Sequence, residues 1–102
     1  MKMSEKFNGD ELILKIEGVF DESTAFTIRD KMNDLLEKNI QTLYLDLDHI
    51  GYISSIGIGV LITAHKNAVK KNKQVLISSI SEKANEMLKA VGILPLFAGK
   101  DK

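Results

Sequence analysis

Residues 42–71, TLYLDLDHIGYISSIGIGVLITAHKNAVKK, join two hydrophobic patterns at a pair of serines. The alternation in Thr42–Ile50 predicts a strand, and apolar residues three and four apart in Ser55–Lys71 predict a helix. Ser54 and Ser55 stand at the junction. A strand followed directly by a helix is typical of a crossover unit, so this stretch indicates parallel strands covered by helices.

Upstream of this stretch, Asn8 and Gly9 precede an alternating apolar run, which predicts an N-terminal hairpin. Residues 21–38 predict a helix, with Ser23 as its N-cap. Its buried stripe is expected to comprise Ala25, Ile28, Met32, Leu35 and Leu36.

Downstream, residues 73–78 predict a strand, and residues 81–92 predict a helix that ends at a left-handed Gly92. We expect Leu96 and Phe97 to pack loosely after it. The whole order of elements predicts a single α/β domain over residues 1–102. It should have a mixed, mostly parallel sheet of four to five strands, including the hairpin, with three to four helices packed on it.

The composition of the 102 residues excludes several classes of function. Fourteen basic residues balance fourteen acidic ones, so charge alone attracts neither nucleic acid nor an anionic membrane. The chain has no cysteine, which excludes disulfides, thiolate metal sites and a cysteine nucleophile. No window has the length of an apolar membrane span, and the N-terminus lacks a signal-peptide pattern. We therefore expect a cytoplasmic protein without a membrane or nucleic-acid partner, in which the lysines at positions 70, 71 and 73 form a solvated helix end.

A helical wheel drawn from Ser55 predicts an apolar surface beside the serines. Ile56 and Val60 fall toward the polar side, and Phe26 falls off the stripe of the first helix. Both helices start where a parallel strand ends, so Asp21 should lie at the same end of the molecule, where ligands of open α/β sheets bind. The buried side of the wheel contains Ile58, Leu61, Ile62, His65, Ala68 and Val69.

Two interpretations of the serines are compatible. One serine can cap the helix by accepting a backbone N–H, which stabilises a helix by about 1 kcal/mol. A serine hydroxyl at a helix N-terminus can also be phosphorylated at little cost to the fold, because this position favours anions.

Other chemistry has weaker support. Asp46 and Asp48 share one face of a strand and could bind magnesium in a small phosphohydrolase or nucleotide-binding protein, but no phosphate-binding loop accompanies them. Gly57 and Gly59 indicate close packing or the approach of a partner backbone, not a dinucleotide site. His49 and His65 lack a second ligand at metal-binding spacing, so we expect neither a metal nor a cofactor.

Residues 18–36, 42–68 and 73–93 together resemble the STAS domain, in particular the bacterial anti-sigma-factor antagonists. The resemblance runs from Glu11 to Phe97. Its most specific part is the joint, where the family commonly has Asp-Ser-Ser-Gly-Leu-Gly or Asp-Ser-Thr-Gly-Leu-Gly and residues 54–59 here are Ser-Ser-Ile-Gly-Ile-Gly.

This resemblance implies a switch between partners and no enzymatic activity. Ser55 aligns with the serine that an anti-sigma serine kinase phosphorylates, and Asp21 with an acidic residue facing it. The unphosphorylated protein would bind the kinase and release a sigma factor, and a metal-dependent serine phosphatase would reverse the modification. We expect a monomer or weak dimer whose partner-binding residues are Asp21, Ser23, Phe26, Ser54, Ser55, Ile56, Gly57, Gly59 and Val60.

The sequence departs from the family pattern twice. Ser54 replaces the usual acid, and Ile56 replaces a small hydroxyl residue. Ser54 is therefore a competing phosphoacceptor. The alternative function is a STAS module without a phosphorylation switch, as a scaffold or an accessory subunit of a signalling complex or a lipid transporter.

Overall fold

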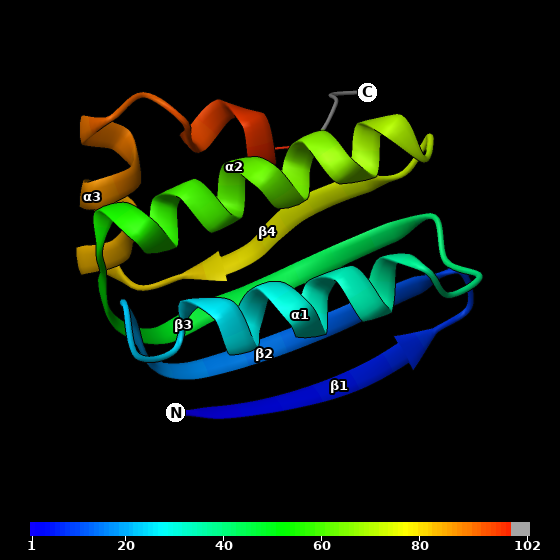
Figure 1. Cartoon of the computed structure of the whole chain (residues 1–102), viewed down its shortest axis with the longest axis horizontal. Coiled ribbons are helices and arrows are strands. Elements are labelled where there is room, and N and C mark those ends of the chain that lie inside the picture. Colours follow the sequence, from blue (N-terminus) through cyan, green and yellow to red (C-terminus); the bar gives the residue numbers. More distant parts are fainter. Residues whose placement is uncertain (99–102) are drawn as a thin grey trace.

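A computed structural model describes residues 1–98 of the chain (Figure 1). The elements in chain order are β1 (Lys2–Asn8), β2 (Glu11–Phe20), α1 (Ala25–Leu36), β3 (Thr42–Ile53), α2 (Ser55–Lys70), β4 (Gln74–Ile80), α3 (Glu82–Ala90) and the short 3-10 helix η1 (Leu94–Phe97).

The four strands form one mixed sheet in the order β1-β2-β3-β4. β1 and β2 are antiparallel, whereas β2, β3 and β4 are parallel to one another. This confirms the predicted fold class, with four strands and three α-helices within residues 1–98. The hairpin is also confirmed, but Asn8 pairs with Glu11, so its two turn residues are Gly9 and Asp10. Gly9 has φ +67°, which glycine adopts without the steric cost of a Cβ.

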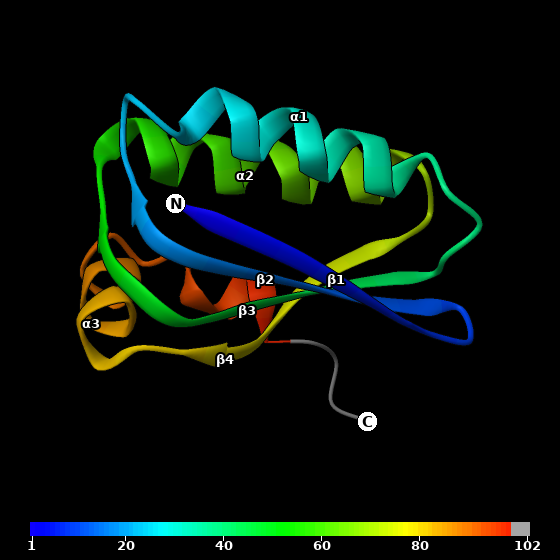
Figure 2. The ribbon, with the colours of Figure 1, turned by 90° about the horizontal axis from the view of Figure 1, so that it is seen from below.

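The helices cover both faces of the sheet. α1 and α2 lie side by side on one face, and α3 and η1 lie on the other (Figure 2). Leu12, Leu14 and Ile16 of β2 alternate with less buried residues, as expected for a strand with one face in the core.

The contact between α1 and α2 rotates the buried face of α2 away from the predicted one. Asn67 of α2 donates a hydrogen bond to Asn33 of α1 at 2.9 Å. Val60 and Ala64 lie on the same helical stripe as Asn67, and both are buried. The predicted exposure of Val60 is therefore wrong, and so is the predicted burial of Val69, which is 58% exposed. A helical wheel contains no information about a neighbouring helix.

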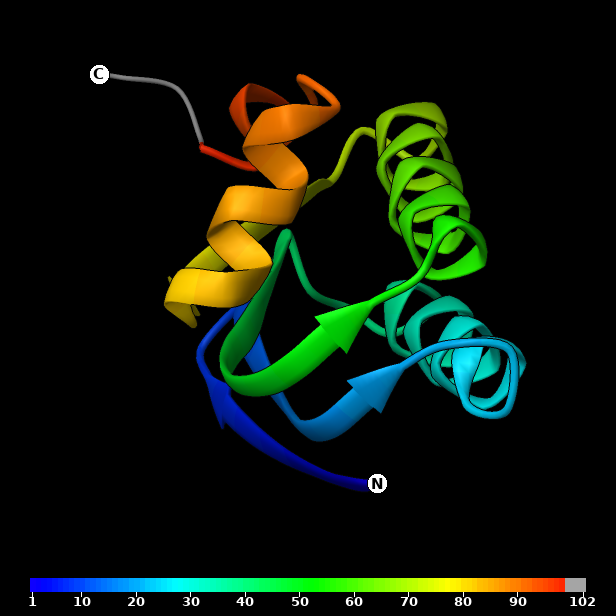
Figure 3. The same cartoon turned by 90° about the vertical axis from the view of Figure 1, so that its left-hand side faces the viewer.

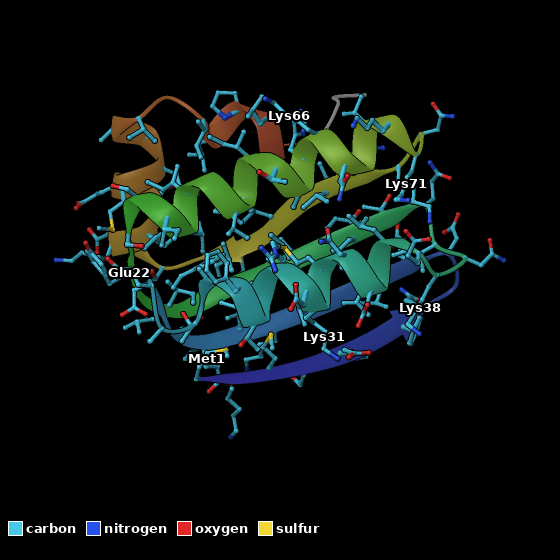
Figure 4. The ribbon with its side chains drawn as sticks, viewed as in Figure 1. Met1, Glu22, Lys31, Lys38, Lys66 and Lys71 are labelled. Atoms are coloured by element: carbon cyan, nitrogen blue, oxygen red, sulfur yellow. The ribbon has the colours of Figure 1, made fainter. Side chains whose placement is uncertain are left out.

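The lysines after α2 are tied to the end of α1. Lys71 pairs with Glu37 at 2.9 Å, and this contact holds the pKa of the Glu37 carboxyl below its usual range. The Lys73 ammonium donates hydrogen bonds to the carbonyls of Leu36 and Lys38 at 2.6 and 2.7 Å. Lys38 and Lys71 both lie at the end of the helical layer opposite Glu22 (Figure 4). Lys70 and Lys71 are exposed, as expected for a solvated helix end. The expectation is wrong for Lys73, which satisfies backbone carbonyls at the C-terminus of the neighbouring helix.

The C-terminal segment also differs from its prediction. Leu96 is partly exposed, but Phe97 is 1% exposed and its ring meets His65 edge-on, with centroids 5.9 Å apart. Phe97 is therefore a core residue that ties η1 to α2. Gly92 has the predicted left-handed conformation, with φ +75°.

None of the helices within residues 1–98 combines the length and the apolar character needed to cross a bilayer.

Candidate functional site

The candidate site forms where β2 and β3 end. Figure 3 looks onto this end, where the two neighbouring strands lead into the starts of α1 and α2. Phe20 and Ile53 are register partners, and the Ser54 N–H donates to the Phe20 carbonyl at 2.8 Å. The loop before α1 and the first turn of α2 therefore lie against each other, which confirms the prediction that Asp21 and Ser55 share one end of the molecule.

The two serines have different environments. Ser54 is the N-cap of α2: it is 7% exposed, and its side chain accepts a hydrogen bond from the Gly57 N–H at 3.2 Å. Ser55 is the first helical residue and is exposed. Serine and aspartate are comparable N-caps, so Ser54 can supply the capping oxygen of the usual family acid without its charge.

The two glycines after the serines also differ. A Cβ on Gly57 would lie 2.7 Å from the Phe20 carbonyl oxygen and 2.9 Å from the Phe20 ring, so only glycine fits there. Gly57 is buried, and close packing is thus its role in the fold. A Cβ on Gly59 would meet nothing within 4 Å, and Gly59 is exposed.

The loop at Asp21 is held by its own hydrogen bonds. The Asp21 carboxylate accepts from the hydroxyl of Ser23 at 2.7 Å and from its N–H at 2.9 Å. These bonds hold the pKa of the Asp21 carboxyl below its usual range, so the group is ionised at neutral pH. The prediction that Ser23 is the N-cap of α1 is wrong. The N-cap is Thr24, whose hydroxyl donates a hydrogen bond to the Val19 carbonyl at 2.8 Å.

The predicted apolar surface is smaller than the wheel indicated. Phe26 is 52% exposed, with the guanidinium of Arg29 4.8 Å from the centre of its ring. Ile56 is half-buried and packs on the core, and Val60 is 7% exposed and belongs to the core. Of the predicted partner-binding residues, Ser23, Phe26, Ser55 and Gly59 are exposed, and Asp21 and Ile56 are half-buried.

Sequence reasoning missed two apolar side chains at the same end. Val19 and Tyr52 are register partners, 38% and 45% exposed. They precede the buried Phe20 and Ile53, so the alternation of a strand directs them to the opposite face of the sheet. That alternation was the sequence signal for them.

A groove of about 630 Å³ lies away from the serine joint, toward the other end of α2. Its lining includes His65, Val69 and Leu96. On β3, Asp46 accepts a hydrogen bond from the Asp48 N–H at 3.2 Å. Within residues 1–98, no group of three or more histidine, cysteine or acidic side chains is placed to hold a metal ion.

Comparison with known proteins gives a match between residues 2–102 and the family model described as the STAS domain. Among solved structures, the unphosphorylated anti-sigma factor antagonist SpoIIAA is 12% identical with a TM-score of 0.80, over 99% of this chain and 89% of that chain. An anti-sigma factor antagonist from Mycobacterium paratuberculosis is 14% identical with a TM-score of 0.83, over 94% and 81%. A sulfate transporter family protein from Wolinella succinogenes is 20% identical with a TM-score of 0.71, over 87% and 73%. At these identities the structures establish a common fold.

Proposed function

This chain belongs to the STAS domain family, and on that premise we propose that it is an anti-sigma-factor antagonist controlled by phosphorylation of Ser55. The unphosphorylated form binds an anti-sigma serine kinase, which releases a sigma factor. Phosphorylation ends this binding, and a serine phosphatase restores it. The chain is then a substrate and not an enzyme.

The observation that carries this proposal is the exposure of Ser55 beside a buried Ser54. A kinase needs a hydroxyl that it can reach, and Ser55 presents one at the first residue of α2. The Ser54 hydroxyl is buried as the N-cap, so its phosphorylation would break the start of the helix. We therefore favour Ser55 over Ser54 as the acceptor.

The fold can carry a phosphate at this position. A phosphoserine adds about −1.5 to −2 charges at neutral pH, and the N-terminus of a helix favours negative charge. The first turn of α2 contains no acidic residue to oppose it. A partner carboxylate at about 4 Å would repel each unit of that charge by roughly 4 kcal/mol at an effective dielectric of about 20. Such repulsion is enough to break an interface while the domain stays folded.

The charge argument is tested by comparing Ser55→Asp with Ser55→Asn. The two side chains have nearly the same size, so only the negative charge separates them. We expect Ser55→Asp to bind the kinase at least about tenfold more weakly than Ser55→Asn, because a loss of about 1.4 kcal/mol has that effect. Affinity is measured by titration calorimetry with the kinase captured from the source cells on the wild-type protein. Equal affinities of the two variants would contradict the electrostatic mechanism.

The phosphorylation itself is read from the native protein. Mass spectrometry of the tryptic peptide of residues 39–66, which contains both serines, should find phosphate on Ser55 that changes between growth and stress. Phosphate on Ser54 would move the acceptor by one residue. Complete absence of phosphate under every condition would overturn the proposal in favour of a STAS scaffold or a transporter accessory subunit.

The apolar part of the site is tested at Phe26. We expect Phe26→Ala to weaken kinase binding by about tenfold or more, because exposed aromatic side chains are frequent anchors of interfaces. The melting temperature should change little, since the ring is 52% exposed in the free protein. Phe7→Ala is the matched control, because Phe7 is 55% exposed on the distant edge strand β1. The same affinity for both variants would remove Phe26 from the interface.

A further inference from the structure

Gly59 is a glycine that the fold does not require. A Cβ added at Gly59 would stand in open space, whereas one added at Gly57 would clash with Phe20. The φ angle of Gly59 also lies outside the left-handed region. Glycine inside a helix is nevertheless less stable than alanine by about 1 kcal/mol. The reason for this residue must therefore lie outside the packing of the domain.

The position of Gly59 relates it to Ser55. The two residues are four apart on α2, so they lie on the same face one turn from each other. This face is the solvent-exposed one, which also carries Thr63, Lys66 and Lys70. Side chains of a helix lean toward its N-terminus and cover the surface over the preceding turn. A long side chain at position 59, such as leucine, would therefore lean over Ser55, whereas the Cβ of an alanine meets nothing within 4 Å.

Phosphoryl transfer to Ser55 requires that its hydroxyl is not covered by a neighbouring side chain. A bond forms between the Ser55 hydroxyl oxygen and the γ-phosphorus of ATP, the bond from that phosphorus to ADP breaks, and the hydroxyl proton passes to a base of the kinase. The attacking and leaving oxygens are roughly in line across the phosphorus. The kinase must thus bring both a base and the nucleotide to one hydroxyl on the surface of a helix.

We propose that Gly59 is an access and specificity residue, which leaves the Ser55 hydroxyl uncovered for the active site of a protein serine kinase. The kinase role rests on the function proposed above. The access itself is a property of this chain alone, so it can be measured without any partner.

The partner-free measurement uses a thiol at position 55. The chain has no cysteine, so Ser55→Cys introduces a single reactive group. In this background, the rates of alkylation by iodoacetamide and by the much larger fluorescein maleimide are compared among three proteins: the one that keeps Gly59, and those that also carry Gly59→Ala or Gly59→Leu. We expect Gly59→Leu to slow the maleimide at least about fivefold and iodoacetamide by less than about twofold, because the leucine side chain covers the preceding turn.

The matched control is Thr63→Leu, which places the same side chain one turn further along the exposed face. That leucine leans over Gly59 and should leave both alkylation rates of the cysteine at position 55 nearly unchanged. If Gly59→Leu also leaves the maleimide rate unchanged, position 59 does not control access and the proposal is overturned.

The second measurement keeps Ser55 and follows its phosphate in the source cells. We expect Gly59→Leu to reduce phosphate on Ser55 at least about tenfold. Gly59→Ala should stay close to the wild-type level of phosphate, because its Cβ meets nothing within 4 Å, and should have an equal or higher melting temperature. Normal phosphorylation of Gly59→Leu would overturn the role of Gly59. Lack of phosphate on the wild-type protein would instead count against the proposed function, and the thiol rates would still decide the question of access.

Discussion

Replacing Phe97 with alanine is expected to lower the free energy of unfolding by about 3–5 kcal/mol, the range for buried phenylalanines. Phe97 is 1% exposed, and it belongs to a four-residue 3-10 helix that has few other anchors in the core. Its ring meets His65 of α2 edge-on and so ties η1 to α2. Loss of the ring removes this tie and leaves a cavity beside α2.

Urea unfolding, followed by circular dichroism, measures this loss as a lower midpoint at a similar slope. Phe7→Ala is the control of the same chemistry, because Phe7 is exposed and its truncation should change the free energy by about 0.5 kcal/mol or less. Equal midpoints for Phe97→Ala and wild type would mean that η1 does not contribute to the core.

Replacing Gly57 with alanine should destabilise the domain by about 2 kcal/mol, after allowance for the higher helix propensity of alanine. The new Cβ would lie 2.7 Å from the Phe20 carbonyl oxygen, which is backbone and cannot rotate away. The same oxygen accepts the hydrogen bond from Ser54 N–H. The start of α2 must therefore move away from the end of β2, and Ser55 moves with it relative to Asp21.

Gly59→Ala is the matched control for this prediction. It is the same substitution in the same helix two residues away, but its Cβ meets nothing within 4 Å. Gly59→Ala should therefore raise the free energy of unfolding by up to about 1 kcal/mol. Thermal melts of the two variants should shift in opposite directions. A rise in both would show that the contact between Gly57 and Phe20 relaxes without cost.

The predicted elements hold up because their signals are local. The apolar residues of α1 at Ala25, Ile28 and Met32 are buried as predicted, since a helix on a flat sheet buries one stripe. The strand at residues 42–50 and the helix from Ser55 follow from periods of about two and 3.6 residues, which a short window reveals. Proximity of Asp21 to the serine joint followed from the parallel arrangement of two neighbouring strands.

The error at Val60 occurred where two elements distant in the sequence meet, whereas the error at Ser23 was local. Val60 is buried on the stripe of α2 that also carries Asn67, which bonds Asn33 of α1, and no periodicity within α2 reports that neighbour. Ser23 had the residue type of an N-cap, but its hydroxyl bonds Asp21 and the helix begins after Thr24. Ser54 and Ser55 have the same side chain, so only the packing of the domain determines that Ser54 is buried and Ser55 is exposed to solvent.

The order of strands and helices, their parallel arrangement and the end of the sheet that carries the serines all follow from hydrophobic periods and turn residues along the chain. These features depend on neighbours in sequence. The burial of Ser54, the exposure of Ser55 and the contrast between Gly57 and Gly59 came only with the packed domain. They depend on how β2 and β3 bring Phe20 against the first turn of α2, and burial is a property of such long-range contacts.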